Sequence, residues 1–187
     1  MDRCSWANGS QDMINYHDYE WGVPSYDDNV LFEFLVLEIM QAGLSWATII
    51  SKRSSIKDAF SNWDYKKVSS YDNTKIEELM NNKNIIRNRL KIDLIILNAK
   101  KFIDIIHDYK SFSNYIWKFV NNKPIINNFE YASNVPSSTK LSKTISDDLK
   151  KKGFKFVGPT IVYSFLQAIG VVNDHTKNCY IKKLNSQ

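Results

Sequence analysis

The stretch that decides the fold is GFKFVGPTIVYSFLQAIGVVNDHTKNC, residues 153–179. Residues 141–152, which precede this stretch, are rich in lysine and have a helical pattern. The pattern ends at Gly153, and glycine is common just after a helix. A second, apolar helix begins at Gly158, with Pro159 in its first turn. The stretch therefore predicts two helices joined by a tight hairpin, within residues 141–170.

The hairpin is a candidate phosphate-binding site, because the second helix begins with N–H groups that have no acceptor inside the helix. Nearby lysines add positive charge, and such a site holds a nucleic-acid backbone without reading its bases. A helical corner that glycine and proline merely terminate is the alternative. If the hairpin binds DNA, we expect the contacts to come from Lys155, Val157, Gly158 and Thr160.

A metal site is indicated by His175 and Cys179, whose spacing places two ligands on one face of a helical turn. The pair alone is a weak signal. However, the chain has only two cysteines and three histidines, and Cys4 and His17 lie near the opposite end. Together they predict a Cys2His2 zinc site that joins the two ends of the chain. A disulfide between Cys4 and Cys179 is the alternative, and no secretory context supports it.

The composition favours a polyanionic partner, since the 187 residues carry a formal net charge of +5. The heavy use of lysine, asparagine and isoleucine weakens this argument. The length suits one core, so we expect residues 1–187 to form a single unit. Without an apolar span or targeting segment, we expect a cytoplasmic monomer with no membrane contact.

Residues 28–42 have the pattern of a buried helix, apolar almost all round and capped by an aspartate at 27 or 28. Two carboxylates interrupt the pattern. Glu33 lies near the N-terminal end, where the helix dipole favours an anion. Glu38 lies among apolar neighbours, where the dipole opposes one. A buried carboxylate is costly unless paired, so Glu38 is a functional candidate, and a salt bridge to an arginine such as Arg87 or Arg89 is the alternative.

Further helices are predicted at residues 45–60, within 64–82, at 85–109 and at 112–120, with an irregular loop at 121–138. Ser45 can cap the first of these, which places Trp46 in its first turn, where the ring can face a cleft or the core. Residues 4–26 lack helical or strand periodicity but hold five aromatic residues, so tertiary contacts or a metal must hold them. No strand alternation is evident, and the predicted fold is all α.

Six motifs follow one another along the whole chain: RCSW at 3–6, YHDYEWGVP at 16–24, LEIMQAGLSW at 37–46, IIRNRLKI at 85–92, GFKFVGPT at 153–160 and NDHTKNC at 173–179. Together they resemble the bacterial 3-methyladenine DNA glycosylase I family of the helix-hairpin-helix glycosylases. The resemblance implies a base-excision hydrolase that flips 3-methyladenine out of alkylated double-stranded DNA and removes it. It also implies one structural Zn²⁺ per chain, with ligands at Cys4, His17, His175 and Cys179.

The resemblance places Glu38 on the carboxylate that contacts the excised base, with Tyr16 and Trp46 on the aromatic walls of the pocket and Trp6 and Trp21 nearby. Adenine methylated at N3 is cationic, so its glycosidic bond is already weak and little acid catalysis is needed. The pocket must instead offset the cost of unstacking and distinguish a cation from neutral adenine. An anionic Glu38 and the face of Trp46 suit a cationic ring, with water as the nucleophile.

The chain departs from related patterns at a few positions. Met13 stands where some relatives carry tyrosine, and Phe156 stands where most helix-hairpin-helix glycosylases have glycine, a difference this family shares. Asp174 lies near the superfamily's catalytic aspartate but adjoins a zinc ligand, and the family is not expected to use it. Pro159 and Thr160 occupy positions where bifunctional relatives place a lysine, so we expect no lyase step.

Two other functions remain open. A non-catalytic, zinc-stapled helix-hairpin-helix module would only hold DNA, but it has no use for Glu38 in an apolar helix beside Trp46. A glycosylase for another alkylated purine, such as 3-methylguanine or 7-methylguanine, would differ in a few pocket contacts only.

Overall fold

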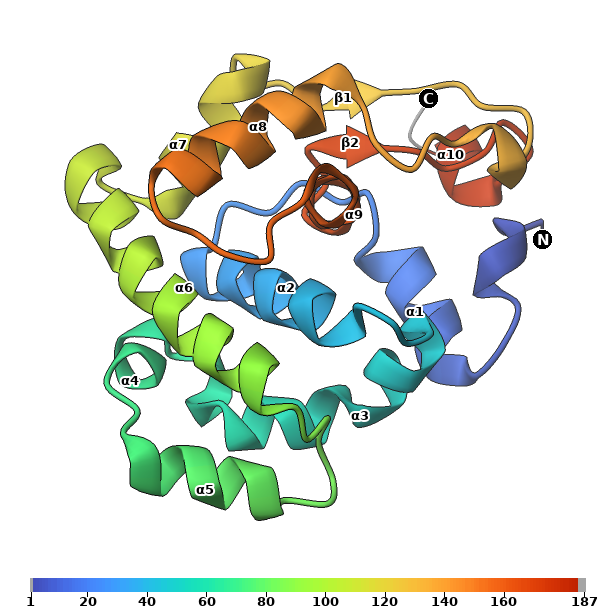
Figure 1. Ribbon diagram of the computed structural model, residues 1–187. Helices are drawn as coiled ribbons and strands as arrows, with labels where there is room; N and C mark the ends of the chain where they lie inside the picture. The colour runs from blue at the N-terminus through green and yellow to red at the C-terminus, as the bar shows by residue number, and fades with distance from the viewer. Residues whose placement is uncertain (1, 185–187) are drawn as a thin grey trace.

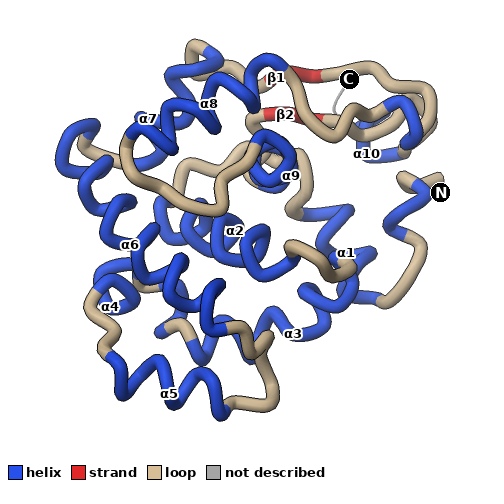
Figure 2. Tube along the Cα trace, viewed as in Figure 1, coloured by secondary structure: helices blue, strands red, loops and turns tan. Residues whose placement is uncertain are grey.

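The computed structural model describes residues 2–184, which fold into helices with almost no strand (Figure 1, Figure 2). The α-helices are α1 (Gln11–Tyr19), α2 (Asp28–Gln41), α3 (Trp46–Ala59), α4 (Tyr65–Ser69), α5 (Asn73–Asn81), α6 (Arg89–Tyr109), α7 (Phe112–Trp117), α8 (Lys140–Lys151), α9 (Pro159–Ala168) and α10 (Tyr180–Leu184). The 3-10 turns are η1 (Ser5–Ala7), η2 (Ser61–Trp63), η3 (Lys118–Val120) and η4 (Ala132–Asn134). The predicted all-α class is confirmed.

Two short strands are the exception within the described residues. β1 (Ile125–Ile126) pairs in parallel with β2 (Val172–Asn173). This pairing attaches the loop predicted at 121–138 to the segment that follows α9. Strands of two residues are too short to produce a visible alternation, which is why the sequence pattern did not indicate them.

Local capping explains where the main helices begin. The side chain of Asp27 accepts hydrogen bonds from the first turn of α2, and the side chain of Ser45 does the same for α3. The predicted start of the long helix at residue 85 is wrong, because α6 begins at Arg89. The side chain of Asn88 caps it by accepting a hydrogen bond from the N–H of Lys91, which leaves residues 85–88 outside the helix.

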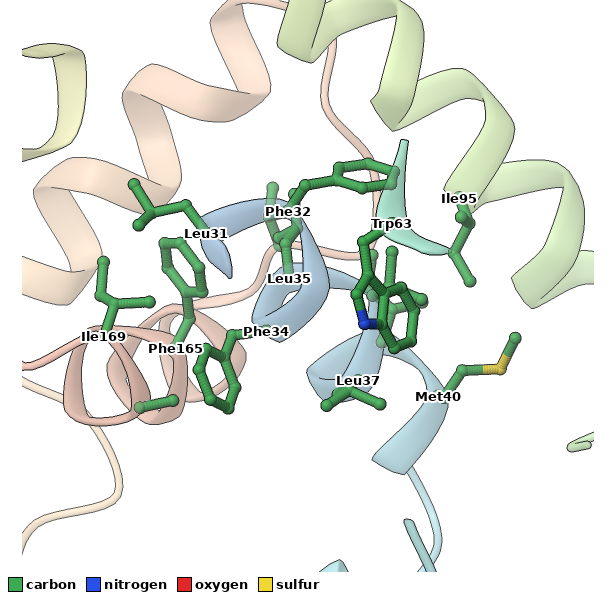
Figure 3. Packing of buried hydrophobic residues seen from close by; sticks show 14 of the residues in the cluster. Leu31, Phe32, Phe34, Leu35, Leu37, Met40, Trp63, Ile95, Phe165 and Ile169 are labelled. Atoms are coloured by element: carbon green, nitrogen blue, oxygen red, sulfur yellow. The ribbon is translucent and has the colours of Figure 1, made fainter. Parts of the chain in front are cut away.

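Helix α2 runs through the centre of the molecule, and every residue from 31 to 40 is buried. Figure 3 shows Phe165 and Ile169, from α9 and its C-terminal end, on one side of α2, and Trp63 and Ile95 on the other. Burial of such side chains contributes about 1.5–3 kcal/mol each. Because α2 is surrounded, any carboxylate on it must either find a partner inside the protein or face a cavity.

The predicted helix-hairpin-helix consists of α8, residues 152–158 and α9 (Figure 1). Gly153 follows α8 with φ +89°, a conformation that favours glycine. The backbone of Lys155 exchanges two hydrogen bonds of 2.8 and 2.9 Å with the Asn98 side chain on α6. This clamp holds the turn, so that Phe156 keeps a φ of +59° although it is not glycine.

The two terminal segments lie side by side, since the N–H of Tyr180 donates to the carbonyl of Asp2 at 2.9 Å. The N-terminal segment also crosses the end of α9, where a Cβ on Gly170 would fall 2.2 Å from the backbone of Val23. Only glycine fits there. Among the helices of residues 2–184, none combines the length and apolar character needed to cross a bilayer.

Candidate functional site

Four buried side chains from the two ends of the chain form one cluster, Cys4, His17, His175 and Cys179, with ligand atoms all within 4.8 Å of one another. The sulfur of Cys179 lies 3.5 Å from His17 Nε2 and 3.4 Å from His175 Nδ1, and the sulfur of Cys4 lies 3.7 Å from His175 Nδ1. A tetrahedral site with Zn–S of about 2.3 Å and Zn–N of about 2.0 Å has S···N separations of about 3.5 Å. The cluster is therefore close enough, and suitably shaped, to bind a metal.

The second nitrogen of each histidine is held by the protein. His175 Nε2 lies 2.9 Å from the carbonyl oxygen of Trp21, which can only accept, so Nε2 carries the proton and Nδ1 is free to bind a metal. His17 Nδ1 lies 2.7 Å from Asp18 Oδ1, so Nδ1 carries the proton and Nε2 keeps its lone pair for the cluster, where the backbone nitrogen of Cys4 also lies 3.4 Å from it. Both cysteines are free thiols, so the alternative disulfide is not formed.

One expectation about this region is wrong. Residues 175–179 do not form a helical turn, because α10 begins only at Tyr180. A non-helical turn, closed by a 2.9 Å hydrogen bond from the N–H of Cys179 to the carbonyl of Thr176, brings His175 and Cys179 together instead. The same spacing thus serves a metal site through a different backbone conformation.

A cavity of about 540 Å³ lies beside this cluster. All five residues that the sequence assigns to the base pocket line it, namely Tyr16, Glu38, Trp46, Trp6 and Trp21. They come from α1, α2, α3, η1 and the segment after α1. The structure therefore brings together residues that are up to 40 positions apart in the sequence. This volume suits a small planar ligand.

Glu38 is only 4% exposed, and no described residue forms a hydrogen bond or ion pair with it. Burial raises the pKa of Glu38 to about 8. The arginine alternative is not realised, because no described arginine, Arg87 included, forms an ion pair with Glu38, and Arg89 pairs with Glu77 and Asp93 on the surface. The other buried carboxylate of α2, Glu33, does have a cationic partner on α3. Glu38 is thus a buried carboxyl group that no described residue neutralises.

Aromatic rings line the cavity next to Glu38. The rings of Tyr16 and Trp46 lie 5.3 Å apart and tilted by 52°, and the rings of Trp6 and Trp21 meet edge to face at 4.8 Å. The ring of Trp6 also lies 5.3 Å from that of His17. The rings that line the cavity thus continue directly into the Cys2His2 cluster, so the cluster supports one wall of the cavity.

The rest of the lining comes from residues that were not expected in the pocket. It includes Ser164 and Gln167 of α9, Ala132 of η4, and Asp174. Asp174 is fully buried and accepts hydrogen bonds of 2.6–2.7 Å from the side chains of Tyr163, Gln167 and Asn127. The i, i+3 spacing of Ser164 and Gln167, which places two polar side chains on one face of a largely apolar helix, could have indicated this lining from the sequence.

At the hairpin, the residues predicted to contact DNA differ in exposure. Lys155 and Thr160 are exposed, and Gly158 is the N-cap of α9, with no side chain capping that helix. The side chain of Val157 is buried at 1% exposure, and its carbonyl accepts a 2.6 Å hydrogen bond from Ser146. Val157 can therefore offer a ligand only its backbone N–H.

Comparison with known proteins is consistent along the whole chain. A family model described as methyladenine glycosylase matches residues 6–183. The DNA-3-methyladenine glycosylase of Haemophilus influenzae is 43% identical over 96% of this chain and 97% of its own length, and DNA-3-methyladenine glycosylase 1 of Escherichia coli is 44% identical over 96% of each. A structure that describes 3-methyladenine recognition by 3-methyladenine DNA glycosylase I from Staphylococcus aureus superposes with a TM-score of 0.93, at 38% identity and with 97% of each chain covered. This chain belongs to the methyladenine glycosylase family.

Proposed function

We propose that this protein removes 3-methyladenine from alkylated double-stranded DNA by hydrolysing the N-glycosidic bond, with the whole chain acting as one unit. The observation that carries the proposal is Glu38, a buried carboxylate without a protein partner, in a cavity walled by Tyr16 and Trp46. A neutral ligand would leave the charge of Glu38 unbalanced. A cationic methylated base balances it, which explains selection against normal adenine.

Glu38 acts as the catalytic residue by contacting the cationic base in its anionic form. The faces of the Tyr16 and Trp46 rings attract the same positive charge and shield it from water. As the bond between C1′ and the base nitrogen breaks, its electron pair goes to the base, which leaves as a neutral purine. Water then supplies the hydroxyl group to C1′ and releases its proton.

The reaction stops at base removal. A lyase step would need an amine to form a Schiff base with the sugar, and none of the described residues that line the cavity is a lysine. Pro159 and Thr160 begin α9, where bifunctional relatives are expected to place one. The protein is therefore monofunctional.

The hairpin holds the DNA while the nucleotide is flipped. The uncapped start of α9 at Gly158 offers N–H groups and the positive end of the helix dipole to a backbone phosphate, with Lys155 exposed beside it. Because Ser164 and Gln167 of the same helix line the cavity, α9 connects the phosphate anchor to the base pocket.

Zinc is the metal that the donor set suits. Cys4, His17, His175 and Cys179 would hold one Zn²⁺ in a closed, four-ligand site, which is structural because no position is left for water or substrate. When bound, zinc would stabilise the junction of the two chain ends. It would thereby hold Trp6 and Trp21 against the cavity.

The direct test is to incubate the purified protein with methylated duplex DNA and identify the released bases by chromatography. Release of 3-methyladenine without strand cleavage is the expected result. Release of 7-methylguanine in preference would assign the protein to another alkylated purine. Binding of the DNA without release of any base would identify a non-catalytic module and contradict the proposal.

A further inference from the structure

Three of the cavity residues stand on three different helices, Tyr16 on α1, Glu38 on α2 and Trp46 on α3. The position of these side chains relative to one another therefore depends on how the three helices are held together. Apolar packing alone specifies volume better than orientation, whereas an ion pair with fixed geometry specifies both.

The side chain of Arg53 joins all three helices. Arg53, on α3, donates to both carboxylate oxygens of Glu20, the C-cap residue of α1, at 2.8 and 2.7 Å. Its Nε donates to Glu33 of α2 at 2.6 Å. The side chains of Arg53, Glu33 and Glu20 are 24%, 11% and 35% exposed, so the contact with Glu33 is better shielded from water than the contact with Glu20. A guanidinium fork is the side-chain group that can make this bidentate contact and a third bond at once.

The same side chain also reaches the cavity through aromatic rings. The guanidinium carbon of Arg53 lies 5.3 Å from the ring centre of Phe34, whose ring centre lies 5.9 Å from that of Tyr16. Through the backbone, the N–H of Glu20 donates to the carbonyl of Tyr16 at 3.0 Å. Two independent contacts, one through Glu20 and one through Phe34, thus lead from Arg53 to Tyr16.

We propose that Arg53 is a positioning residue for the base cavity: it orients Tyr16 against Glu38 and Trp46 by joining α1, α2 and α3. This inference rests on the proposed function, because it assigns Arg53 a role in binding the methylated base. Arg53 does not line the cavity and so acts through Tyr16 and not by touching the base.

The test is the affinity of Arg53→Lys for free 3-methyladenine, measured by quenching of tryptophan fluorescence. Lysine keeps the charge but loses the bidentate and stacked geometry, so we expect about a tenfold weaker Kd. Arg89→Lys is the matched control, because Arg89 also joins two helices by ion pairs, on the surface between α5 and α6. It should leave the Kd unchanged.

A double-mutant cycle with Tyr16→Phe separates positioning from general stability. If Arg53 acts through Tyr16, the combined loss of affinity is smaller than the product of the two single losses. Glu20→Gln, which breaks only the contact to α1, should reproduce most of the Arg53→Lys effect and serves if that variant does not fold.

Two outcomes would overturn the assignment: folded variants with wild-type Kd but lower melting temperature, or losses that multiply independently with Tyr16→Phe. If instead the wild-type protein fails to bind 3-methyladenine, the proposed function is wrong and the role of Arg53 in it falls as well.

Discussion

The Cys2His2 cluster and the cavity around Glu38 are neighbouring buried sites, but only in the cluster do all the polar side chains have hydrogen-bond partners. In the cluster, both histidines are oriented by hydrogen bonds, to Asp18 and to the carbonyl of Trp21, and face two thiols. In the cavity, Glu38 has no partner among the described residues and a pKa raised to about 8 by burial. A satisfied buried site stabilises the fold, whereas an unsatisfied one costs stability and is retained for a ligand.

The largest effect is expected when the Cys2His2 cluster is disrupted. Structural zinc in small domains contributes apparent free energies of about 10–16 kcal/mol, so Cys179→Ser should lose most of its zinc and lower the melting temperature by about 10 °C or more. Elemental analysis and thermal unfolding check this. His107→Ala, at the exposed histidine outside the cluster, is the control and should change neither. Full metal content and full stability in Cys179→Ser would refute the zinc assignment.

Substitution of Glu38 in the cavity should lower activity but raise stability. Glu38→Gln keeps the shape but removes the charge that binds the cationic base, a loss of about 1.5–3 kcal/mol. Excision should therefore slow by about 10- to 150-fold in single-turnover assays. A folded Glu38→Gln protein that excises 3-methyladenine at the wild-type rate would remove Glu38 from the mechanism.

The difference in stability between Glu38→Gln and the wild type should depend on pH. The folded pKa of Glu38, about 8, is above the ordinary value of 4.5, so the carboxyl group contributes stability that is present below pH 4.5 and is lost as the pH rises through 8. At pH 9, Glu38→Gln should exceed the wild type in free energy of unfolding by up to about 5 kcal/mol, and at pH 4.5 the difference should nearly vanish. Denaturant unfolding at both pH values measures this. Glu33→Gln, which leaves an arginine unpaired, should be less stable than the wild type at pH 7.

The rate of excision should also report the protonation of Glu38. Only the carboxylate form attracts the cationic base, so kcat/KM on methylated DNA should rise with pH, by at most tenfold per unit, and level off near pH 8. The profile of Glu38→Gln should lack this rise. A wild-type profile that is flat between pH 6 and 8 would show that Glu38 is already ionised in the free protein.

The smallest effect is expected at the hairpin. A Cβ at Gly158 meets no atom within 4 Å and its φ is −63°, so Gly158→Asp is tolerated by the fold but places a negative charge at the phosphate anchor. DNA affinity should fall about fivefold, equally for damaged and undamaged duplex, in a binding titration at fixed salt. Gly158→Ala adds a Cβ in the same open space without a charge or a capping oxygen, and should bind nearly as the wild type does. Unchanged affinity in Gly158→Asp would exclude this helix start as the anchor.

Much of the fold could be predicted from local sequence. Asp27 and Ser45 cap α2 and α3 as expected, and the glycine and proline of residues 153–159 mark the hairpin correctly. The small number of cysteines and histidines was enough to assemble the cluster, and an isolated carboxylate in an apolar helix was enough to single out Glu38. These features depend on contacts within about four residues, or on residue types too rare to combine in several ways.

Other features were decided only when the helices packed. Nothing near Glu33 or Glu20 in the sequence indicates that both meet Arg53, and nothing near Glu38 indicates that no arginine reaches it. The wall formed by Gln167 and its neighbours, and the non-helical turn before Cys179, likewise depend on tertiary contacts. The physical reason is that the sequence determines which faces of each helix are apolar, whereas the relative rotation of the packed helices determines which polar groups meet and which one is left facing the cavity.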